Sequence, residues 1–436
     1  MLERRLQQRY QQLVLEHMSS AQPLAAGLRS LPETADSFAS VQAAWRFYAN
    51  PQVTLPYLAQ PLLDQARQAV AAACQHFALV VHDWSQLHYN DQDAKQHRVP
   101  LSQGTDLGYE LHAAVVLSDQ TGAPLAPVYH GLRAGDGVHS TTTAQPETPL
   151  SQLDALAPVM AAVDQLGWAK PCVHILDREA DSVAHLRHWH QVGYCFVVRA
   201  NDRGRARWHG QHLALRVLAQ RLRRRGAFRA TRTVDYRGRP VQQWVAETSV
   251  TITRPAKLQR QGKQGPRWQV RGAPLSLRLV VVELRDSRGR VLSQWLLLTN
   301  APARVDAATV ALWYYWRWQI ETYFKLLKGA GQQLEAWQQA TPTALAKRLL
   351  VAAMACVLVW QLARSAHPQA ARVRTFLIRL SGRVMKRGQA FTIPALLAGM
   401  WVYLHVLRAR EDPELGEMHE LVPLIMFGQP PQREAG

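Results

Sequence analysis

Hydrophobic positions divide the chain into three kinds of segment. Residues 1–76 and 341–410 carry apolar residues at helical spacing, interrupted at Asn50-Pro51 because the residue before a proline avoids the helical conformation. Residues 77–201 contain short, continuous apolar runs that are typical of buried strands. Residues 203–300 alternate between apolar and polar positions, with Gly- and Arg-rich turns between the runs. The pattern predicts an α/β protein with a mostly antiparallel β insert, flanked by helical N- and C-terminal regions.

The middle of the chain has a definite order of elements. Between residues 77 and 201 the pattern predicts strand, strand, strand, helix, strand, helix, strand, and Gly193 closes the second helix. The first strand ends in "VVHD" at Asp83, and the fourth ends in "HILD" at Asp177. Two buried strands therefore each end in a carboxylate.

A further charged group is expected on a helix at residues 307–328, between Asp306 as the N-cap and Gly329 just beyond the end. Advancing about 100° per residue places Arg317, Glu321, Lys325 and Lys328 on one arc about 80° wide, with Tyr314 inside it. Apolar and aromatic residues fill the neighbouring arc. One interpretation is a solvated stripe stabilised by i,i+4 ion pairs. The other is a metal or phosphate site, which the narrowness of the polar stripe favours.

Composition narrows the choice of partner. The 436 residues hold 51 Lys and Arg against 32 Asp and Glu, which gives a net charge of +19. This excess indicates a polyanionic partner, and nucleic acid is the first candidate. An acidic membrane surface is disfavoured because we expect no apolar run of about 18 residues and no signal peptide at the N-terminus. The four cysteines are scattered without a CxxC pair, which favours a cytoplasmic protein without disulfides or a zinc knuckle.

The two strand-end carboxylates point to metal chemistry. Buried acids cost desolvation energy unless they meet a cation or hydrogen-bond donors, and two that lie close together repel each other. A divalent ion is the natural neutraliser, and oxygen-only ligands favour Mg²⁺ or Mn²⁺ over zinc. Glu321 supplies a third carboxylate, which would complete a two-metal site for phosphodiester chemistry. The alternative for Asp83 or Asp177 taken alone is a helix N-cap or a turn residue.

The spacing of the charged helix then suggests a family. Tyr314, Arg317, Glu321 and Lys328 spell Y-x2-R-x3-E-x6-K, which is similar to the signature of bacterial cut-and-paste DDE transposases of the insertion-sequence-four family. Segments that resemble other parts of that family run in the right order from about residue 9 to about residue 340. They are "WRFYANPQV", "HDWSQLHY", "DREAD" and "WLLLTN".

The resemblance implies a ribonuclease H-like core in which Asp83, Asp177 and Glu321 are the catalytic, metal-binding triad, with two Mg²⁺ ions that Mn²⁺ can replace. It also implies DNA-binding residues beside the scissile bond, in contact with phosphates or bases. They are Tyr314, Arg317, Lys325, Lys328, Trp295 and Arg178. Trp295 matches the family tryptophan that stacks on a flipped base, although a core aromatic on a strand is the other interpretation. The sequence departs from the family at Trp84, where a small polar residue is common, and in its short N-terminus.

These interpretations divide the chain into four parts. We expect a helical DNA-binding domain at 1–75, a catalytic core at 76–202 and 301–340, a β-rich insertion domain at 203–300 and a helical C-terminal region at 341–436. The two apolar helical stretches of the C-terminal region would either join two protomers or pack on the core. The resemblance implies a dimer on DNA, and the mutual repulsion of the basic chains favours a monomer in free solution.

The expected function is that of a transposase that acts on double-stranded DNA, both the element's ends and the target, in the bacterial cytoplasm and on the nucleoid. A related metal-dependent endonuclease without strand transfer, or a catalytically silent DNA-binding protein, stays open. Two further motifs carry weaker predictions. The basic run "RLRRRG" at 221–226 is either a solvated face or a phosphate contact. In "HLRHWH" at 185–190 we expect packing rather than metal binding, because only His185 and His188 share a helix face.

Overall fold

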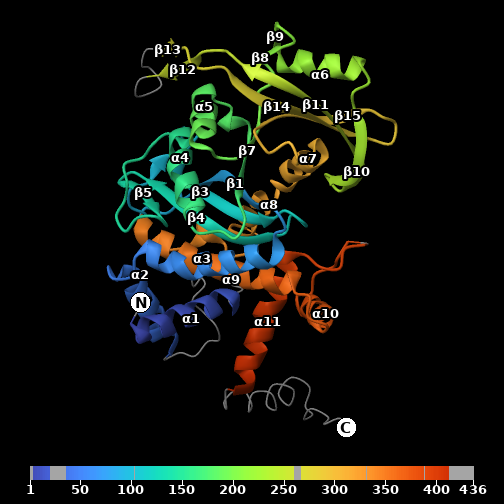
Figure 1. The fold of residues 1–436 in the computed structure, drawn as a ribbon. Coiled ribbons are helices and arrows are strands. Elements are labelled where there is room, and N and C mark those ends of the chain that lie inside the picture. Colours follow the sequence, from blue (N-terminus) through green and yellow to red (C-terminus); the bar gives the residue numbers. More distant parts are fainter. Residues whose placement is uncertain are drawn as a thin grey trace.

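The computed structural model describes residues 3–19, 36–102, 104–259, 267–329, 331–386 and 388–411. It confirms a mixed α/β protein built on one large sheet. Helices of the N- and C-terminal regions lie below the core strands in Figure 1, and the strands of residues 203–300 lie above them.

The core strands form one part of the large sheet. From one edge they run β5-β4-β3-β1-β6-β7. Their bounds are β1 Ala78–His88, β3 Leu107–Ser118, β4 Pro124–Ala134, β5 Gly137–Ser140, β6 Cys172–Leu176 and β7 Phe196–Arg199, and a short β2, Val99–Pro100, pairs with β3. β1 is antiparallel to β3 and parallel to β6, and β6 is parallel to β7. β1 therefore joins the antiparallel half of the sheet to the parallel half.

Two helices connect the strands of this region: the first leads from β5 to β6, and the second makes the parallel crossover from β6 to β7. They are α4, Gln152–Asp164, and α5, Val183–Val192. Ser151 caps α4 by accepting a hydrogen bond from the backbone N–H of Asp154, and Gly193 ends α5 in the left-handed conformation, as predicted. Both helices bury apolar residues against the sheet. The predicted strands and helices of residues 77–201 are present in the predicted order, but the short strands β2 and β5 were not predicted.

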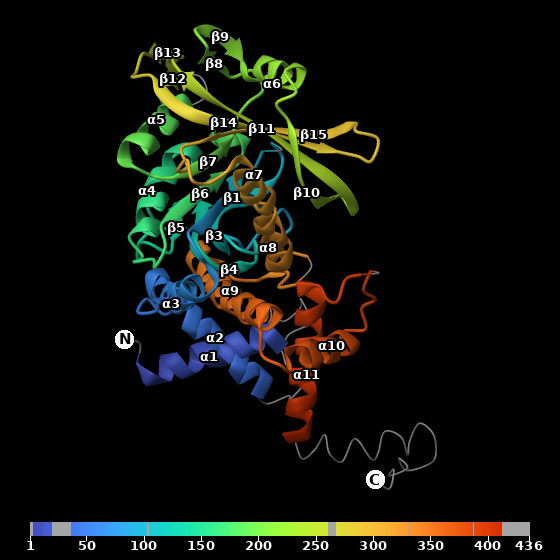
Figure 2. The ribbon, with the colours of Figure 1, turned by 45° about the vertical axis from the view of Figure 1, so that its right-hand side comes forward.

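The strands after residue 203 pair antiparallel throughout, as predicted. They are β8 Arg205–Trp208, β9 Gln211–Ala214, β10 Arg229–Tyr236, β11 Arg239–Ile252, β12 Ala256–Gln259, β13 Arg267–Val270, β14 Leu275–Arg285 and β15 Val291–Thr299. The basic run lies at the end of a helix, α6, Leu215–Arg224, and in the residues that follow it. β15 pairs antiparallel with β7, so these strands continue the core sheet, except β12 and β13, which form a separate two-stranded sheet; the two views show the strands extending beyond the core (Figure 2).

The charged helix is not continuous, which corrects the single helix predicted for residues 307–328. It consists of α7, Ala307–Trp316, and α8, Gln319–Leu327. Asp306 caps α7 as predicted. At Arg317 and Trp318 the backbone N–H groups bond three residues back, to Tyr314 and Tyr315, instead of four. The chain therefore turns between the two helices, at the residue whose side chain reaches the core strands.

The C-terminal helices pack under the sheet. They are α9 Pro342–Arg364, α10 Ala370–Leu380 and α11 Ile393–Glu411, preceded by a 3₁₀ turn η2, Leu334–Ala336. α9 contacts the N-terminal helices α1 Arg4–Ser19, α2 Asp36–Ala49 and α3 Leu55–Ala73, and also β4. By length and composition α9 is apolar enough to span a membrane, so the expectation that no such run exists is wrong. Its most apolar window is 83% buried inside the protein, as in the core helix of a globular domain.

Candidate active site

The two carboxylates come from adjacent parallel strands. Asp177 directly follows β6, as predicted, but Asp83 lies in the middle of β1, so the prediction that the first strand ends at Asp83 is wrong. β1 and β6 pair in a constant register that ends with Val81 beside Ile175. Two residues further along each strand, the same register sets Asp83 beside Asp177. Neighbours in register on parallel strands project to the same face of the sheet. The pleat and the register together explain why two acids 94 positions apart come close.

Each aspartate also makes local hydrogen bonds. Asp83 accepts from the backbone N–H of Trp84 at 3.0 Å. Asp177 is the N-cap of the 3₁₀ turn η1, Arg178–Ala180, and accepts from the N–H of Glu179 at 2.8 Å. Asp177 is therefore a turn residue, as the alternative interpretation states. These local bonds use only the Oδ1 atom of each carboxylate, so they leave Oδ2 for other contacts.

Arg317 brings the third carboxylate to this pair. Its Nη1 atom donates to Oδ2 of Asp83 at 2.9 Å, and its Nη2 atom lies 3.9 Å from Oε1 of Glu321. The charge of Asp177 also acts on the guanidinium. The break between α7 and α8 places Arg317 over the sheet, and Glu321 follows one turn later. Two strands and a helix thus direct three carboxylates towards one buried cation.

The environment of Asp83 is unfavourable for a negative charge. The pKa of this carboxyl is raised to about 6, chiefly by burial; the neighbouring Glu321 and Asp177 also act to raise it, while Arg317 and the N–H of Trp84 act to lower it. A carboxylate held in this way gains from any added cation. The site has the electrostatic character of a cation-binding centre.

The donor set fits a hard divalent ion, because all three side chains offer oxygen and none offers nitrogen or sulfur. The present spacing suits a guanidinium: among the described residues, no three His, Cys, Asp or Glu side chains are close enough to hold one metal ion. This also holds for the histidine-rich segment of α5, where His185 instead bonds to Ser182 and to Asp154.

The remaining charged residues of the signature divide between two surroundings. Lys328 ends α8, and its Nζ atom donates to the carbonyl of Gln86 at 2.7 Å and pairs with Glu335 at 3.0 Å. Lys325 and Arg178 are exposed, the latter on the turn directly after Asp177. Arg317 and Lys328 therefore both reach β1, at Asp83 and Gln86, whereas Lys325 is exposed.

A pocket of about 590 Å³ adjoins the carboxylates on the Arg317 side. Its wall includes Trp295 and Tyr314, whose rings meet edge to face with centroids 5.3 Å apart. Trp318, which is 60% exposed, lies beside them. The pocket combines aromatic surfaces with positive charge. Trp295 is partly buried: it packs against the hydrophobic core and also lines the pocket.

Of the residues that line this pocket, the sequence predicted only Trp295, Tyr314 and Arg317 as site residues; those it missed include Arg199, Tyr236 and Arg237. Arg199 ends β7, Tyr236 ends β10, and Arg237 stands in the turn after it with a positive φ of 56°. No local pattern marks them, since they approach Tyr314 and Trp295 only because β15 pairs with β7 in the folded sheet.

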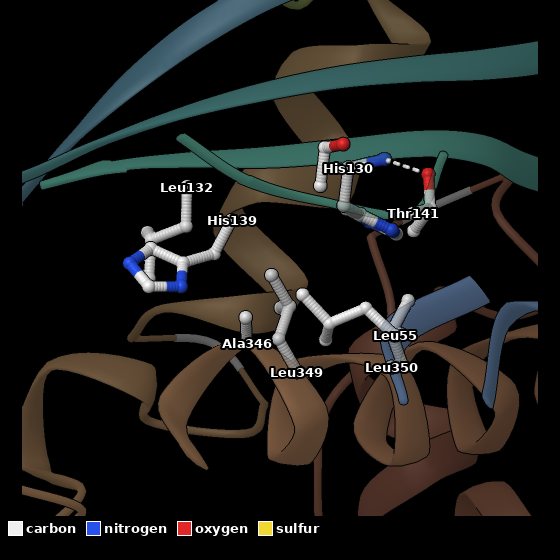
Figure 3. A pocket seen from close by; sticks show the side chains of 9 residues that line it. Leu55, His130, Leu132, His139, Thr141, Ala346, Leu349 and Leu350 are labelled. Carbon is white, nitrogen blue, oxygen red and sulfur yellow. Dashed lines mark hydrogen bonds between the residues drawn. The ribbon is translucent and has the colours of Figure 1, made fainter. Parts of the chain in front are cut away.

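A second hollow is a poor candidate for a ligand site. It lies between the strands of the core and helices α3 and α9, and Figure 3 shows His130 and His139 above Leu55, Leu349 and Leu350. It leaves essentially no room for a water molecule. Its histidines are already bonded, His130 to Tyr323 and His139 to Asp136 and Thr343. The hollow is a packing feature.

Comparison with known families decides what kind of protein carries this site. Residues 79–358 match the family model described as "Transposase DDE domain". The chain belongs to this family of transposases. The matched region contains all three carboxylates and the whole charged signature.

Comparisons of this transposase with curated proteins and with solved structures give less information. None of the curated proteins compared with it matches. Among solved structures it is similar to a piggyBac transposase in a synaptic complex with hairpin DNA, with 10% identity and a TM-score of 0.34. That match covers 83% of this chain and 59% of the other, so the chain spans less than two thirds of the length of that relative.

Proposed function

We propose that this protein is the transposase of a bacterial insertion sequence of the insertion-sequence-four type. It binds the ends of its element, cuts the donor DNA by metal-dependent phosphodiester hydrolysis and transesterification, and joins the ends to a target. The observation that carries the proposal is the convergence of Asp83, Asp177 and Glu321 around Arg317 within the DDE-domain match.

The fold supports a ribonuclease H-like core. The order β4-β3-β1-β6-β7, with β1 antiparallel to β3 and parallel to β6, supports this part of the proposal. Asp83 and Asp177 both lie just beyond the paired stretch of the two central parallel strands, near the carboxyl ends where ligands bind in open α/β sheets. The antiparallel strands from β8 to β15 stand as an insertion before the glutamate helix, and residues 1–75 are proposed as a DNA-binding domain.

The catalytic carboxylates are proposed to hold two Mg²⁺ ions, which Mn²⁺ can replace. Bound there, the metal would activate the attacking oxygen and stabilise the leaving oxygen of the phosphodiester. Asp83 and Asp177 contribute from rigid strands, so their spacing depends on the sheet register, whereas Glu321 approaches on a short helix. In this arrangement Arg317 exchanges its contact with Asp83 for one with a DNA phosphate.

The surrounding residues are proposed to bind DNA. Arg317, Lys325, Lys328, Arg178 and Tyr314 lie in or near the site and supply cations and a hydroxyl group for phosphates. The pocket beside Trp295 and Tyr314 has a volume within the range of small-molecule sites, and its aromatic walls suit an unpaired base. This favours the stacking interpretation of Trp295.

Assembly follows from the chemistry. Joining two ends requires two active sites, so we propose a dimer on DNA and a monomer in free solution, acting in the cytoplasm on nucleoid DNA. α9 is core, which leaves α10 and α11 as the interface. Their exposed apolar residues are Val373, Phe376, Val402 and Val406.

A strand-transfer assay tests the proposal. Purified protein, Mg²⁺, a supercoiled target and a linear fragment bearing the element's own terminal repeats should give joined products, and Asp177→Ala should give none while still binding the fragment. Nicks without joined products would favour the related endonuclease. Binding without nicks would favour a silent DNA-binding protein.

A further inference from the structure

The strand that carries Asp83 has an open edge beyond that residue. β1 runs to His88 beside β3, but its pairing with β6 ends at Val81. Tyr89 donates its backbone N–H to Leu107, so odd-numbered residues of this stretch bond towards β3 and even-numbered ones face the other way. Among the described strands none pairs with that edge after Val81. The carbonyl of Gln86 and the N–H of His88 therefore need other partners.

Two side chains from the end of α8 and the turn η2 bond to these backbone groups. Lys328 donates to the carbonyl of Gln86 at 2.7 Å, and Glu335 accepts from the N–H of His88 at 2.9 Å. The same Oε1 atom of Glu335 lies 3.0 Å from Nζ of Lys328. Carbonyl, ammonium, carboxylate and N–H thus form a continuous chain along the open edge. The motif lysine is fixed to the strand of Asp83 through two contacts instead of one.

Glu335 is itself held firmly. Its backbone carbonyl accepts from the side-chain amide of Gln92 at 2.7 Å, and the carbonyl of its neighbour Leu334 accepts from the hydroxyl of Tyr89 at 2.8 Å. Both donors come from the segment that continues β1. The carboxylate therefore has a fixed position relative to Asp83, although it belongs to a turn seven residues after Lys328.

We propose that Glu335 is a positioning residue that orients Lys328 for contact with DNA at the active site, an inference that rests on the proposed function. A lysine ammonium has three donors on a flexible stem that loses rotamer freedom when it is ordered. Gln86 and Glu335 use two donors and leave the third for a phosphate. Placing a reacting group in advance lowers the barrier of the reaction, because its ordering does not have to occur in the transition state.

Electrostatics argues that orientation, not affinity, is the purpose. A carboxylate beside a phosphate-binding lysine repels DNA and weakens binding. Removing Glu335 should therefore leave DNA affinity equal or higher while slowing cleavage. The alternative is that Glu335 only covers the open edge of β1 by accepting from the N–H of His88. In that case the effect of removing Glu335 would not depend on whether Lys328 is present.

The experiment compares Glu335→Ala, Glu335→Gln, Lys328→Ala and the double variant Lys328→Ala/Glu335→Ala in single-turnover cleavage of end DNA. Glu335→Ala should lower the cleavage rate about 10-fold or more at saturating protein, without weaker end binding. Glu335→Gln keeps an acceptor oxygen and should retain most of the rate. In the Lys328→Ala background, the loss caused by Glu335→Ala should vanish.

Glu247→Ala is a matched control. The side chain of Glu247 is 33% exposed, like that of Glu335, and forms an ion pair with Arg278 on the neighbouring strand β14. The substitution Glu247→Ala therefore removes the same charge at a different place. It should cut like wild type. If Glu335→Ala lowers the cleavage rate equally with and without Lys328, the proposal is overturned, and Glu335 only covers the edge of β1. A wild-type cleavage rate in Glu335→Ala would also overturn it.

A second readout separates this inference from the proposed function. Lys328 of the DNA-free protein should be acetylated by acetic anhydride faster in Glu335→Ala than in wild type or Glu247→Ala, as measured by peptide mass spectrometry. If wild type cuts no end DNA, the proposed function fails, while faster acetylation still supports the pairing. Equal acetylation in all three proteins would contradict the pairing itself.

Discussion

Arg317 and Asp83 are separated by 234 residues and joined by a 2.9 Å hydrogen bond between Nη1 and Oδ2. The guanidinium is the cation around which Asp83, Asp177 and Glu321 gather in this structure. Because the three acids come from separate elements, this cation also links α8 to the core sheet. Its removal has consequences for stability as well as for chemistry.

Arg317→Ala should lower the free energy of unfolding by about 2 kcal/mol in EDTA, because it leaves a half-buried acidic group without its partner. Millimolar Mg²⁺ should restore more stability to this variant than to wild type, since an ion can then compensate the carboxylates. Urea unfolding with and without Mg²⁺ measures both effects. Equal stability of Arg317→Ala and wild type in EDTA would contradict the role given to the guanidinium.

Acid should destabilise the protein below about pH 6.5, through buried neutral histidines. Burial lowers the pKa of His112 and of His130 to about 3. The unfolded chain therefore binds more protons than the folded one between about pH 6.5 and 3, so stability is complete above this window and falls as the pH drops through it. Melting temperatures from pH 7.5 to 4.5 measure the effect.

His112 provides a specific test of that pH dependence. Its ring stacks on Trp84 with centroids 4.3 Å apart, and its Nε2 atom has no hydrogen-bond partner among the described residues. His112→Phe should keep the stacking and flatten the loss of melting temperature in acid. His188→Gln, on the exposed face of α5, should leave the slope unchanged. Parallel slopes for wild type and His112→Phe would contradict the assignment.

The sequence predicted the parts of this site that depend on local pattern. Asp83 and Asp177 each follow a continuous apolar run, which marks a buried strand, and the two strands pair in parallel, although β1 continues past Asp83 to His88. Asp306 and Gly193 carry the usual capping chemistry and were predicted at the correct ends. The helix carrying Glu321 was likewise expected from its apolar spacing.

The rest of the site depends on tertiary contacts that the pattern does not contain. A helical wheel assumes an unbroken helix, whereas the attraction between Arg317 and the buried Asp83 accompanies a tight turn at that residue. Glu335 contacts β1 only because β1 extends beyond its pairing with β6, so that its backbone groups there need other partners. Arg199 and Arg237 reach the pocket through the pairing of distant strands. Each is a consequence of topology.

Trp295→Ala should impair the handling of an unpaired base at the element's end. Stacking on an aromatic ring contributes about 1–3 kcal/mol per base. With 2-aminopurine at the flipped position, wild type should quench the probe by stacking, and Trp295→Ala should leave it brighter and cut more slowly. Trp168→Ala, which truncates another partly buried tryptophan, in the loop after α4 and outside the pocket, is the control. Identical fluorescence in Trp295→Ala and wild type would contradict a stacking role.

Phe376→Glu should prevent assembly on DNA without unfolding the protein. Phe376 is 47% exposed on α10 and contacts Tyr403 of α11 edge to face. Light scattering should show a monomer for free wild type, a dimer with two ends when end DNA is added, and one protein per end for the variant. A dimeric complex of Phe376→Glu with unchanged stability would place the interface elsewhere.

The central claim is that the Asp83 carboxylate holds the catalytic metal, and metal preference tests it most directly. Cleavage of a linear end fragment is measured for wild type and Asp83→Cys with Mg²⁺ and with Mn²⁺. A thiolate is a poor ligand for Mg²⁺ and a better one for Mn²⁺. Asp83→Cys should therefore lose about 100-fold or more of the Mg²⁺ rate, recover part of it in Mn²⁺, and bind the fragment like wild type. Cleavage by Asp83→Cys at the wild-type rate in Mg²⁺ would contradict the account.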